Sequence, residues 1–232
     1  FLNKIKHNFN GYKIGVYSQL AKNFLVKAGI AKKKQIHIVG CSRLNKSFEY
    51  KKIIPENKIL YYAIEPGRGI PTYLKTYGKH YFKKFSKFEL HNPSDDLKNL
   101  HFEIVNLLKN FAKKNPNINI IIKIKIGDTY YKKLYKSLPK NIKLEYGGAG
   151  HKLLKKSKII IGWNSTAILE GIAANRFIII PNFIKKNINL KRKDELILNL
   201  SKNSYVKNKV EFINKLNLLI NKKYKPYKNY NN

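Results

Sequence analysis

Cysteine and methionine are almost missing from this 232-residue chain, which contains one cysteine and no methionine. The lone Cys41 excludes an internal disulfide and a cysteine-rich zinc site, and it fits a reducing cytoplasm. The histidines have no partners at metal-ligand spacing, so we expect no metal site. No apolar run reaches the ~18 residues that a membrane-spanning helix needs, and no signal peptide is visible.

Acidic residues are scarce as well: 13 Asp and Glu stand against 48 Lys and Arg, for a formal net charge of +35. Such a charge favours a nucleic acid or an anionic membrane as partner. However, only four of the basic residues are arginines, the side chain that reads phosphate and guanine best. Lysine is spread along the chain with abundant Asn and Ile, as an AT-rich genome would favour. Nucleic-acid binding is therefore a secondary hypothesis.

Strand and helix patterns alternate from Lys58 onward. Five short apolar runs are typical of strands buried on both faces of a parallel sheet: 58–64, 118–124, 142–146, 159–161 and 177–180. Apolar residues at helical spacing cover 94–114 and 206–220, the latter with Val210, Ile213 and Leu216 inward. The sequence predicts an α/β fold with a Rossmann-like, mostly parallel sheet and helices on both faces.

The most informative stretch is 157–183, which reads as strand, tight turn, helix and strand. Three good N-cap residues mark the helix start: Asn164, Ser165 and Thr166. A helix N-terminus with free N–H groups and hydroxyls favours a phosphate or diphosphate. Glu170 follows about a turn later, where a carboxylate could accept hydrogen bonds from a ribose diol. The alternative is an ordinary helix cap with a solvated Glu170.

A glycine loop follows the predicted strand 58–64. It reads Glu65-Pro66-Gly67-Arg68-Gly69 and lies where ligands bind in open α/β folds, at the carboxyl ends of the strands. Gly67 and Gly69 would permit close backbone approach, and Arg68 could clamp a diphosphate with two hydrogen bonds. Glu65 is the acid nearest this loop and hence a candidate catalytic group.

The segment GWNSTAILEGIAANRFIIIPNF resembles the donor-nucleotide segment of GT-B glycosyltransferases, in particular those that build bacterial surface and capsular polysaccharide. It is also similar to the CDP-glycerol glycerophosphotransferase-like group. The resemblance covers about 36–183. Within it, Gly40-Cys41-Ser42-Arg43 resembles a GxPRxD-type hinge, with Ser42 replacing Pro and Asn45 replacing Asp.

The resemblance implies a division of the chain. Residues 1–50 would be the end of an N-terminal GT-B domain and its hinge, and 51–222 the C-terminal nucleotide-sugar-binding domain. A disordered tail would follow at 223–232. Since the chain begins at Phe1, we expect a fragment that lacks much of the N-terminal domain.

The resemblance also implies site residues. Those that bind the donor phosphate would be Gly67, Arg68, Gly69, Lys125, Asn164, Ser165 and Thr166. The nucleoside would contact Gly147, Gly148, Gly150 and Glu170, although the glycines fit a plain tight turn equally well. Lys125 would take the place of the histidine in a KxHP-like element. The catalytic residue is not identified; Glu65 and His101 are candidates.

The implied reaction is glycosyl transfer from a nucleotide-activated sugar to a surface polysaccharide or lipid-linked glycan acceptor. It would need neither metal nor another cofactor, and the base would lie in the missing domain. A basic surface suits an enzyme beside the anionic inner face of the cell membrane. The alternatives are a CDP-glycerol-type glycerophosphotransferase, a sugar-nucleotide epimerase and a basic nucleic-acid binder. An epimerase would need a set of carboxylates and histidines around the sugar, and this chain has few such residues.

Overall fold

A computed structural model describes residues 9–64, 93–124, 134–148, 150–163, 165–183 and 202–225. The chain forms two compact units, Phe1–Asn45 and Lys46–Asn232. The division falls inside the segment that resembles a hinge, where a 3₁₀ turn, η3 (Ser42–Leu44), leads into the short helix α2 (Asn45–Glu49). The assignment of functions to the predicted domains stays a prediction.

The first unit is a β-α-β element. Strands β1 (Ile14–Val16) and β2 (Ile36–Ile38) pair in parallel, and helix α1 (Gln19–Lys27) connects them through the 3₁₀ turn η2 (Lys33–Gln35). Helix α1 begins where the Ser18 side chain accepts a hydrogen bond from the backbone N–H of Ala21, 3.2 Å away. It ends before Gly29, whose φ of 68° an L-residue rarely adopts. The apolar spacing of 18–28 predicts this helix, and the short apolar run 36–39 predicts the second strand. Both predictions are confirmed, whereas β1 was not predicted.

Helix α1 has no buried residue. Leu20 and Phe24 on this helix are 49% and 53% exposed, and Val39 after β2 is 67% exposed. One helix on two strands buries too little apolar surface to be stable alone. The described part of this unit therefore presents apolar side chains that it does not itself cover.

The second unit is built on a six-stranded sheet in which every described pair is parallel. Its strands are β3 (Glu56–Tyr62), β4 (Asn119–Ile124), β5 (Ile142–Tyr146), β6 (Ser157–Ile161), β7 (Phe177–Pro181) and β8 (Tyr205–Val206). Their spatial order is β5-β4-β3-β6-β7-β8. The predicted strands are confirmed within two residues, and β8 is an addition.

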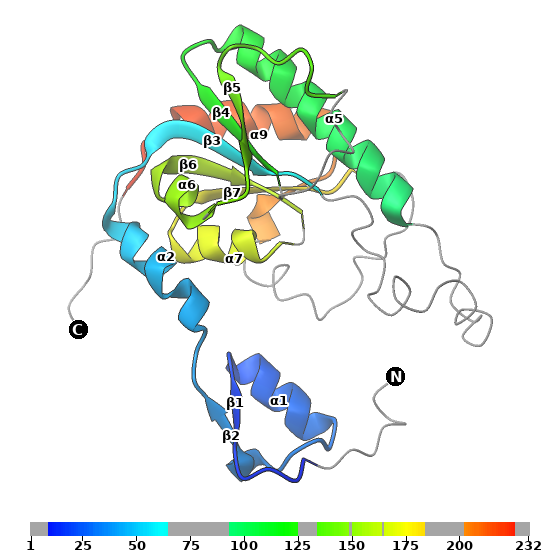
Figure 1. Ribbon diagram of the computed structural model, residues 1–232, viewed down its shortest axis with the longest axis vertical. Coiled ribbons are helices and arrows are strands. Elements are labelled where there is room, and N and C mark those ends of the chain that lie inside the picture. The colour runs from blue at the N-terminus through cyan, green and yellow to red at the C-terminus, as the bar shows by residue number, and fades with distance from the viewer. Residues whose placement is uncertain are drawn as a thin grey trace. The chain divides into compact units, whose positions relative to one another are not determined.

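Helices cover both faces of this sheet (Figure 1). One face carries α5 (Pro93–Lys114) and α9 (Lys209–Asn221), and the other carries α6 (Gly150–Lys156) and α7 (Thr166–Ala173). The described residues of this unit also form the 3₁₀ turns η4 (Tyr50–Lys52) and η5 (Lys202–Ser204). The chain therefore has the predicted α/β fold with a Rossmann-like parallel sheet.

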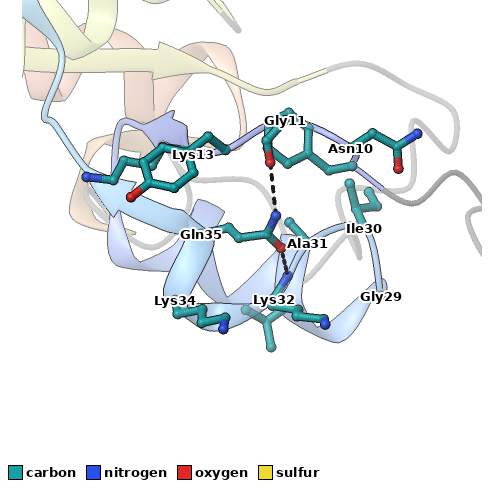
Figure 2. A pocket seen from close by; sticks show the side chains of 12 residues that line it. Asn10, Gly11, Lys13, Gly29, Ile30, Ala31, Lys32, Lys34 and Gln35 are labelled. Atoms are coloured by element: carbon teal, nitrogen blue, oxygen red, sulfur yellow. Dashed lines mark hydrogen bonds between the residues drawn. The ribbon is translucent and has the colours of Figure 1, made fainter.

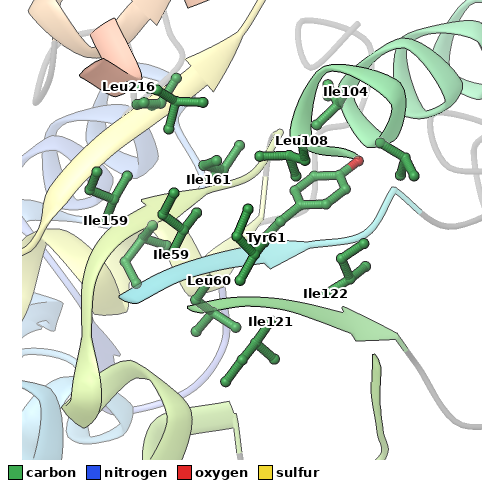
Figure 3. Packing of buried hydrophobic residues seen from close by; sticks show 14 of the residues in the cluster. Ile59, Leu60, Tyr61, Ile104, Leu108, Ile121, Ile122, Ile159, Ile161 and Leu216 are labelled. Atoms are coloured by element: carbon green, nitrogen blue, oxygen red, sulfur yellow. The ribbon is translucent and has the colours of Figure 1, made fainter. Parts of the chain in front are cut away.

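The core lies on both sides of the central strands, as their unbroken apolar sequences require. Ile59 and Tyr61 of β3 lie on the face toward α5 and α9, and Leu60 lies on the opposite face (Figure 3). All three side chains are fully buried. The alternation of side chains along β3 thus fills two hydrophobic layers with one strand.

The last helix begins later than its apolar spacing predicted. Asn208 caps it by accepting a hydrogen bond from the backbone N–H of Glu211 at 2.8 Å. Val206 therefore belongs to β8, and Val210 is 70% exposed rather than buried. Phe212 takes the inward position instead. The prediction for Val210 was wrong because the cap sets the phase of the helix.

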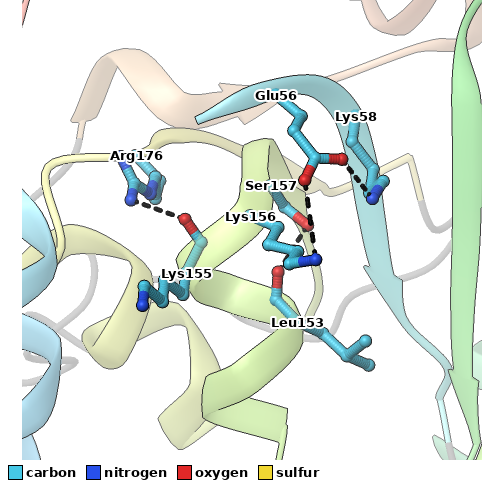
Figure 4. A network of polar contacts seen from close by, with 7 residues as sticks. All are labelled: Glu56, Lys58, Leu153, Lys155, Lys156, Ser157 and Arg176. Atoms are coloured by element: carbon cyan, nitrogen blue, oxygen red, sulfur yellow. Dashed lines mark hydrogen bonds and ion pairs between the residues drawn. The ribbon is translucent and has the colours of Figure 1, made fainter. Parts of the chain in front are cut away.

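Arg176 joins four segments at the opposite edge of the sheet from the strand ends discussed below. It is almost fully buried and follows Asn175, which has the left-handed φ of 58° that an asparagine just past the end of a helix predicts. Its guanidinium donates to the carbonyl oxygens of Tyr50, Ile53, Leu154 and Lys155 and to the hydroxyl of Tyr224. Figure 4 shows the bond to Lys155 beside the ion pairs of Glu56 with Lys58 and Lys156.

Tyr224 belongs to the predicted disordered tail, so that prediction does not hold at the start of the tail. The hydroxyl of Tyr224 lies 2.8 Å from the Arg176 guanidinium, and its ring packs edge-on against Phe177. Residues 226–232 lie outside the described residues.

Candidate functional site

The order of the strands reverses direction in the middle of the sheet. β3 and β6 are neighbours, but β4 and β5 lie on one side of them and β7 and β8 on the other. In open α/β sheets, ligands bind outside the carboxyl ends of the two strands at such a switch point. The predicted phosphate-binding segments follow these two strands in sequence, 65–69 after β3 and 164–166 after β6. The strand order therefore brings the ends of β3 and β6 together at the edge where such a site is expected.

The β6–α7 turn is the described part of this site. Ser165 is the N-cap of α7, and its hydroxyl oxygen accepts a hydrogen bond from the backbone N–H of Ala167 at 3.3 Å. Thr166 is the first helical residue and is exposed. Because α7 returns the chain from one parallel strand to the next, its N-terminus lies at the carboxyl edge of the sheet. The predicted start of the helix is confirmed.

Glu170 is only 8% exposed, so the alternative of a solvated helix residue is wrong. It follows Thr166 by one helical turn, which places the two side chains on neighbouring parts of the helix surface. Burying a carboxylate is unfavourable unless it is hydrogen-bonded. The proposed contact with a ribose stays a prediction.

The glycine loop after β5 reaches the same region. Gly147 and Gly148 have φ values of 61° and 66°, which only glycine adopts readily. The hydroxyl of Tyr62, the last residue of β3, donates to the carbonyl oxygen of Gly150 at 3.3 Å. A Cβ added to Gly162 would lie 3.7 Å from the Cβ of Tyr62. Tyr62 therefore lies between the glycine loop and the β6–α7 turn.

Sequence reasoning missed Tyr62 and also Lys123, whose ammonium donates to the carbonyl oxygen of Gly147. Both lie inside runs that were interpreted only as buried strands. The available signal was a polar side chain in the last two residues of a strand that ends at the ligand-binding edge.

His101 lies in α5 and is fully buried. Its Nδ1 lies 2.7 Å from the hydroxyl of Tyr61, and its Nε2 lies 2.9 Å from the hydroxyl of Tyr135. Burial lowers the pKa of His101 to about 3, so the imidazole is neutral at physiological pH. A general acid or base must reach its substrate. This enclosure favours a structural role over the predicted catalytic one.

Six of the predicted site residues lie outside the described residues: Glu65, Gly67, Arg68, Gly69, Lys125 and Asn164. In the sequence, Lys125 directly follows Ile124, the last residue of β4. The roles of these six residues stay predictions. Across the described ranges, no group of three or more His, Cys, Asp and Glu could hold a metal ion. In the same ranges, no helix is both long and apolar enough to cross a membrane.

The first unit contains a separate hollow of about 1070 Å³ (Figure 2). Gln35 spans it, with its side-chain amide donating to the Gly11 carbonyl oxygen and accepting from the backbone N–H of Lys32. The lining residues 9–13 and 32–35 directly precede β1 and β2. The hollow therefore lies at the amino ends of these strands, away from the edge where α/β folds bind ligands.

Comparison with known proteins places the fold but not the family. No protein-family model and no curated protein matches the sequence. Two solved structures are similar: UDP-GlcNAc 2-epimerase from Methanocaldococcus jannaschii, with a TM-score of 0.54, and UDP-GlcNAc 2-epimerase from Neisseria meningitidis bound to UDP-GlcNAc, with a TM-score of 0.50. Each is 14% identical to this chain.

The aligned regions cover 92% and 90% of this chain but only 56% and 53% of the two epimerases. The chain thus spans little more than half the length of these proteins. At such low identity the likeness shows the fold alone, which is an α/β fold with a Rossmann-like, parallel sheet.

Proposed function

We propose that this chain carries the nucleotide-sugar-binding half of a GT-B-type enzyme, with a nucleoside diphosphate bound at the carboxyl ends of β3 and β6. One observation carries the proposal: the switch point of the sheet coincides with the capped N-terminus of α7 and the buried carboxylate of Glu170. The similar Neisseria structure was determined with UDP-GlcNAc bound, which agrees with a ligand of this class.

The chemistry proposed for this half is electrostatic. The free N–H groups and partial positive charge at the start of α7, with the hydroxyls of Ser165 and Thr166, would stabilise the diphosphate. Arg68 and Lys125 would add cationic charge from the two neighbouring loops. Charge that develops on a departing diphosphate would thus meet preorganised donors, without a metal ion. Glu170 would accept hydrogen bonds from the ribose.

Glycosyl transfer to a surface polysaccharide or lipid-linked glycan is the reaction we propose first, because of the segment 162–183 and its resemblance to donor-nucleotide segments. Epimerisation of the nucleotide sugar is the second candidate, favoured by the names of the two similar structures. It requires proton-transferring groups around the sugar. His101, the histidine proposed near the site, is enclosed by Tyr61 and Tyr135, which weighs against epimerisation by this half.

The first unit fits the acceptor side of such an enzyme. Its exposed Leu20, Phe24 and Val39 would be covered by further layers of an N-terminal domain. The general base for the acceptor would belong to that domain. A net charge of +35 suits work beside an anionic membrane surface.

Replacing Glu170 by Gln tests the proposed ribose contact without changing the size of the side chain. We expect the Glu170→Gln chain to bind UDP roughly tenfold more weakly, because a carboxylate accepts stronger hydrogen bonds than an amide. The measurement is calorimetric titration of the folded chain. Glu49→Gln, which changes an exposed carboxylate on α2, is the matched control. Equal affinity of the two variants for UDP would contradict the proposed role of Glu170.

A further inference from the structure

Three polar side chains lie in register across the carboxyl edge of the sheet. Tyr62 of β3 pairs with Lys123 of β4, and Lys123 pairs with Glu145 of β5. Residues paired in this way point to the same face of a sheet. Tyr62 also contacts α6, so this row lies on the face that carries α6 and α7.

The glycine loop, by which we mean Gly147, Gly148 and Gly150, follows β5 directly after this row. Lys123 donates from its ammonium to the Gly147 carbonyl oxygen, and the Tyr62 hydroxyl donates to the Gly150 carbonyl oxygen at 3.3 Å. The backbone N–H of Gly147 also donates to the carbonyl oxygen of Ile124 at 3.3 Å. Both ends of the loop are therefore held by β3 and β4, the strands nearer the switch point.

These hydrogen bonds to the loop have an energetic consequence. Glycine loses more conformational freedom than any other residue when it is fixed, and both Gly147 and Gly148 are held at positive φ. A loop that is ordered before a ligand arrives spares the complex that entropy loss. The ammonium of Lys123 suits the task because charged donors make stronger hydrogen bonds to carbonyl oxygens than neutral donors do.

The position of Lys123 is otherwise unfavourable. Burial lowers the pKa of its amine, and the carboxylate of Glu145 on the neighbouring strand acts in the opposite direction. An exposed lysine would avoid this desolvation. What a lysine at this position gains is therefore its hydrogen bond to the Gly147 carbonyl oxygen.

We infer that Lys123 and Tyr62 are positioning residues that hold the glycine loop in the conformation that receives the nucleoside part of the ligand. This inference rests on the proposed function, since it assigns a purpose to the loop within the same site. It predicts that loosening the loop weakens contacts with the base and ribose but leaves the phosphate contacts at α7 unchanged.

The test uses the full chain with Lys123→Met and Tyr62→Phe, which keep the apolar parts of both side chains. Lys143→Met and Tyr146→Phe are matched controls, because these residues lie exposed on β5.

Lys123→Met and Tyr62→Phe are called the brace variants below. Without ligand, hydrogen exchange in a peptide covering 146–151 should be faster than in the wild type for the two brace variants only. In calorimetry, affinity for UDP and for uridine should fall about tenfold in Lys123→Met and about threefold in Tyr62→Phe, because a charged donor is the stronger one. Affinity for pyrophosphate should stay that of the wild type.

Loop exchange equal to wild type in both brace variants overturns the inference, and so does a loosened loop with unchanged uridine affinity. An equal loss of pyrophosphate and uridine affinity also overturns it, because Lys123 would then act through charge rather than through the loop. If the loop of the wild-type chain is protected from hydrogen exchange but the chain has no affinity for UDP, the proposed function itself is overturned. The role that we infer for Lys123 and Tyr62 is then overturned with it.

Discussion

We expect the Arg176→Met chain to lose about 3 kcal/mol of unfolding free energy in the second unit, because several buried hydrogen bonds are broken at once. Arg176 donates to four carbonyl oxygens and one hydroxyl. Each acceptor left without a donor away from water is destabilising. Desolvation of the guanidinium acts in the other direction, and it lowers the pKa of Arg176. The hydrogen bonds outweigh this desolvation penalty because they use all the nitrogens of the guanidinium.

The measurement is urea unfolding followed by the fluorescence of Trp163, the single tryptophan, which is buried in the second unit. Arg176→Lys should lie between wild type and Arg176→Met, because an ammonium has only three donors. Arg43→Met removes the same charge from an exposed position and serves as control. A loss below about 1 kcal/mol for Arg176→Met would be that of an ordinary surface change and would contradict this account.

Acid should destabilise the second unit through His101. Above pH 6.5 the imidazole is neutral in both the folded and the unfolded chain. Below that pH the unfolded chain takes up a proton, whereas the folded chain does not do so until about pH 3. The folded pKa is the lower one, so this contribution to stability is present above pH 6.5 and is lost as the pH falls. The expected slope is about 1.4 kcal/mol per pH unit, a total on the order of 5 kcal/mol across the window.

His101→Gln isolates this effect, since glutamine stays neutral at every pH. We expect the difference in unfolding free energy between wild type and His101→Gln to shrink steadily from pH 6.5 to pH 3. His151→Gln replaces the histidine at the start of α6 and serves as the matched control. Parallel pH profiles for wild type and His101→Gln would show that the folded chain protonates as readily as the unfolded chain.

Much of the fold could be predicted because most strands carry their own signal. The isoleucine-rich runs 120–122 in β4, 159–161 in β6 and 177–180 in β7 are buried on both faces of the sheet, so each run is apolar without a break. β1 and β8, with three and two residues, have too few positions to show a pattern, and pairing with β2 and β7 defines them. The strand order, and therefore the switch point, depends on packing between distant segments and is not readable from local spacing.

The candidate site likewise has some features that could be predicted from the sequence and others that could not. The cap at Ser165 and the left-handed Asn175 were predicted, because both depend on neighbours in sequence. The roles of Tyr62 and Lys123 depend on the register of three strands, so no local pattern indicates them. Arg176 is similar: its acceptors come from three separate segments.

Nucleotide binding by the wild-type chain tests the central claim most directly. UDP, CDP, CMP, GDP and dTDP would be titrated at moderate salt by calorimetry, with an oligonucleotide as the control ligand. The account predicts saturable binding of one nucleoside diphosphate, weakened in Glu170→Gln. Tight oligonucleotide binding that falls steeply with salt, without affinity for any of the mononucleotides, would contradict it and indicate a basic nucleic-acid-binding protein.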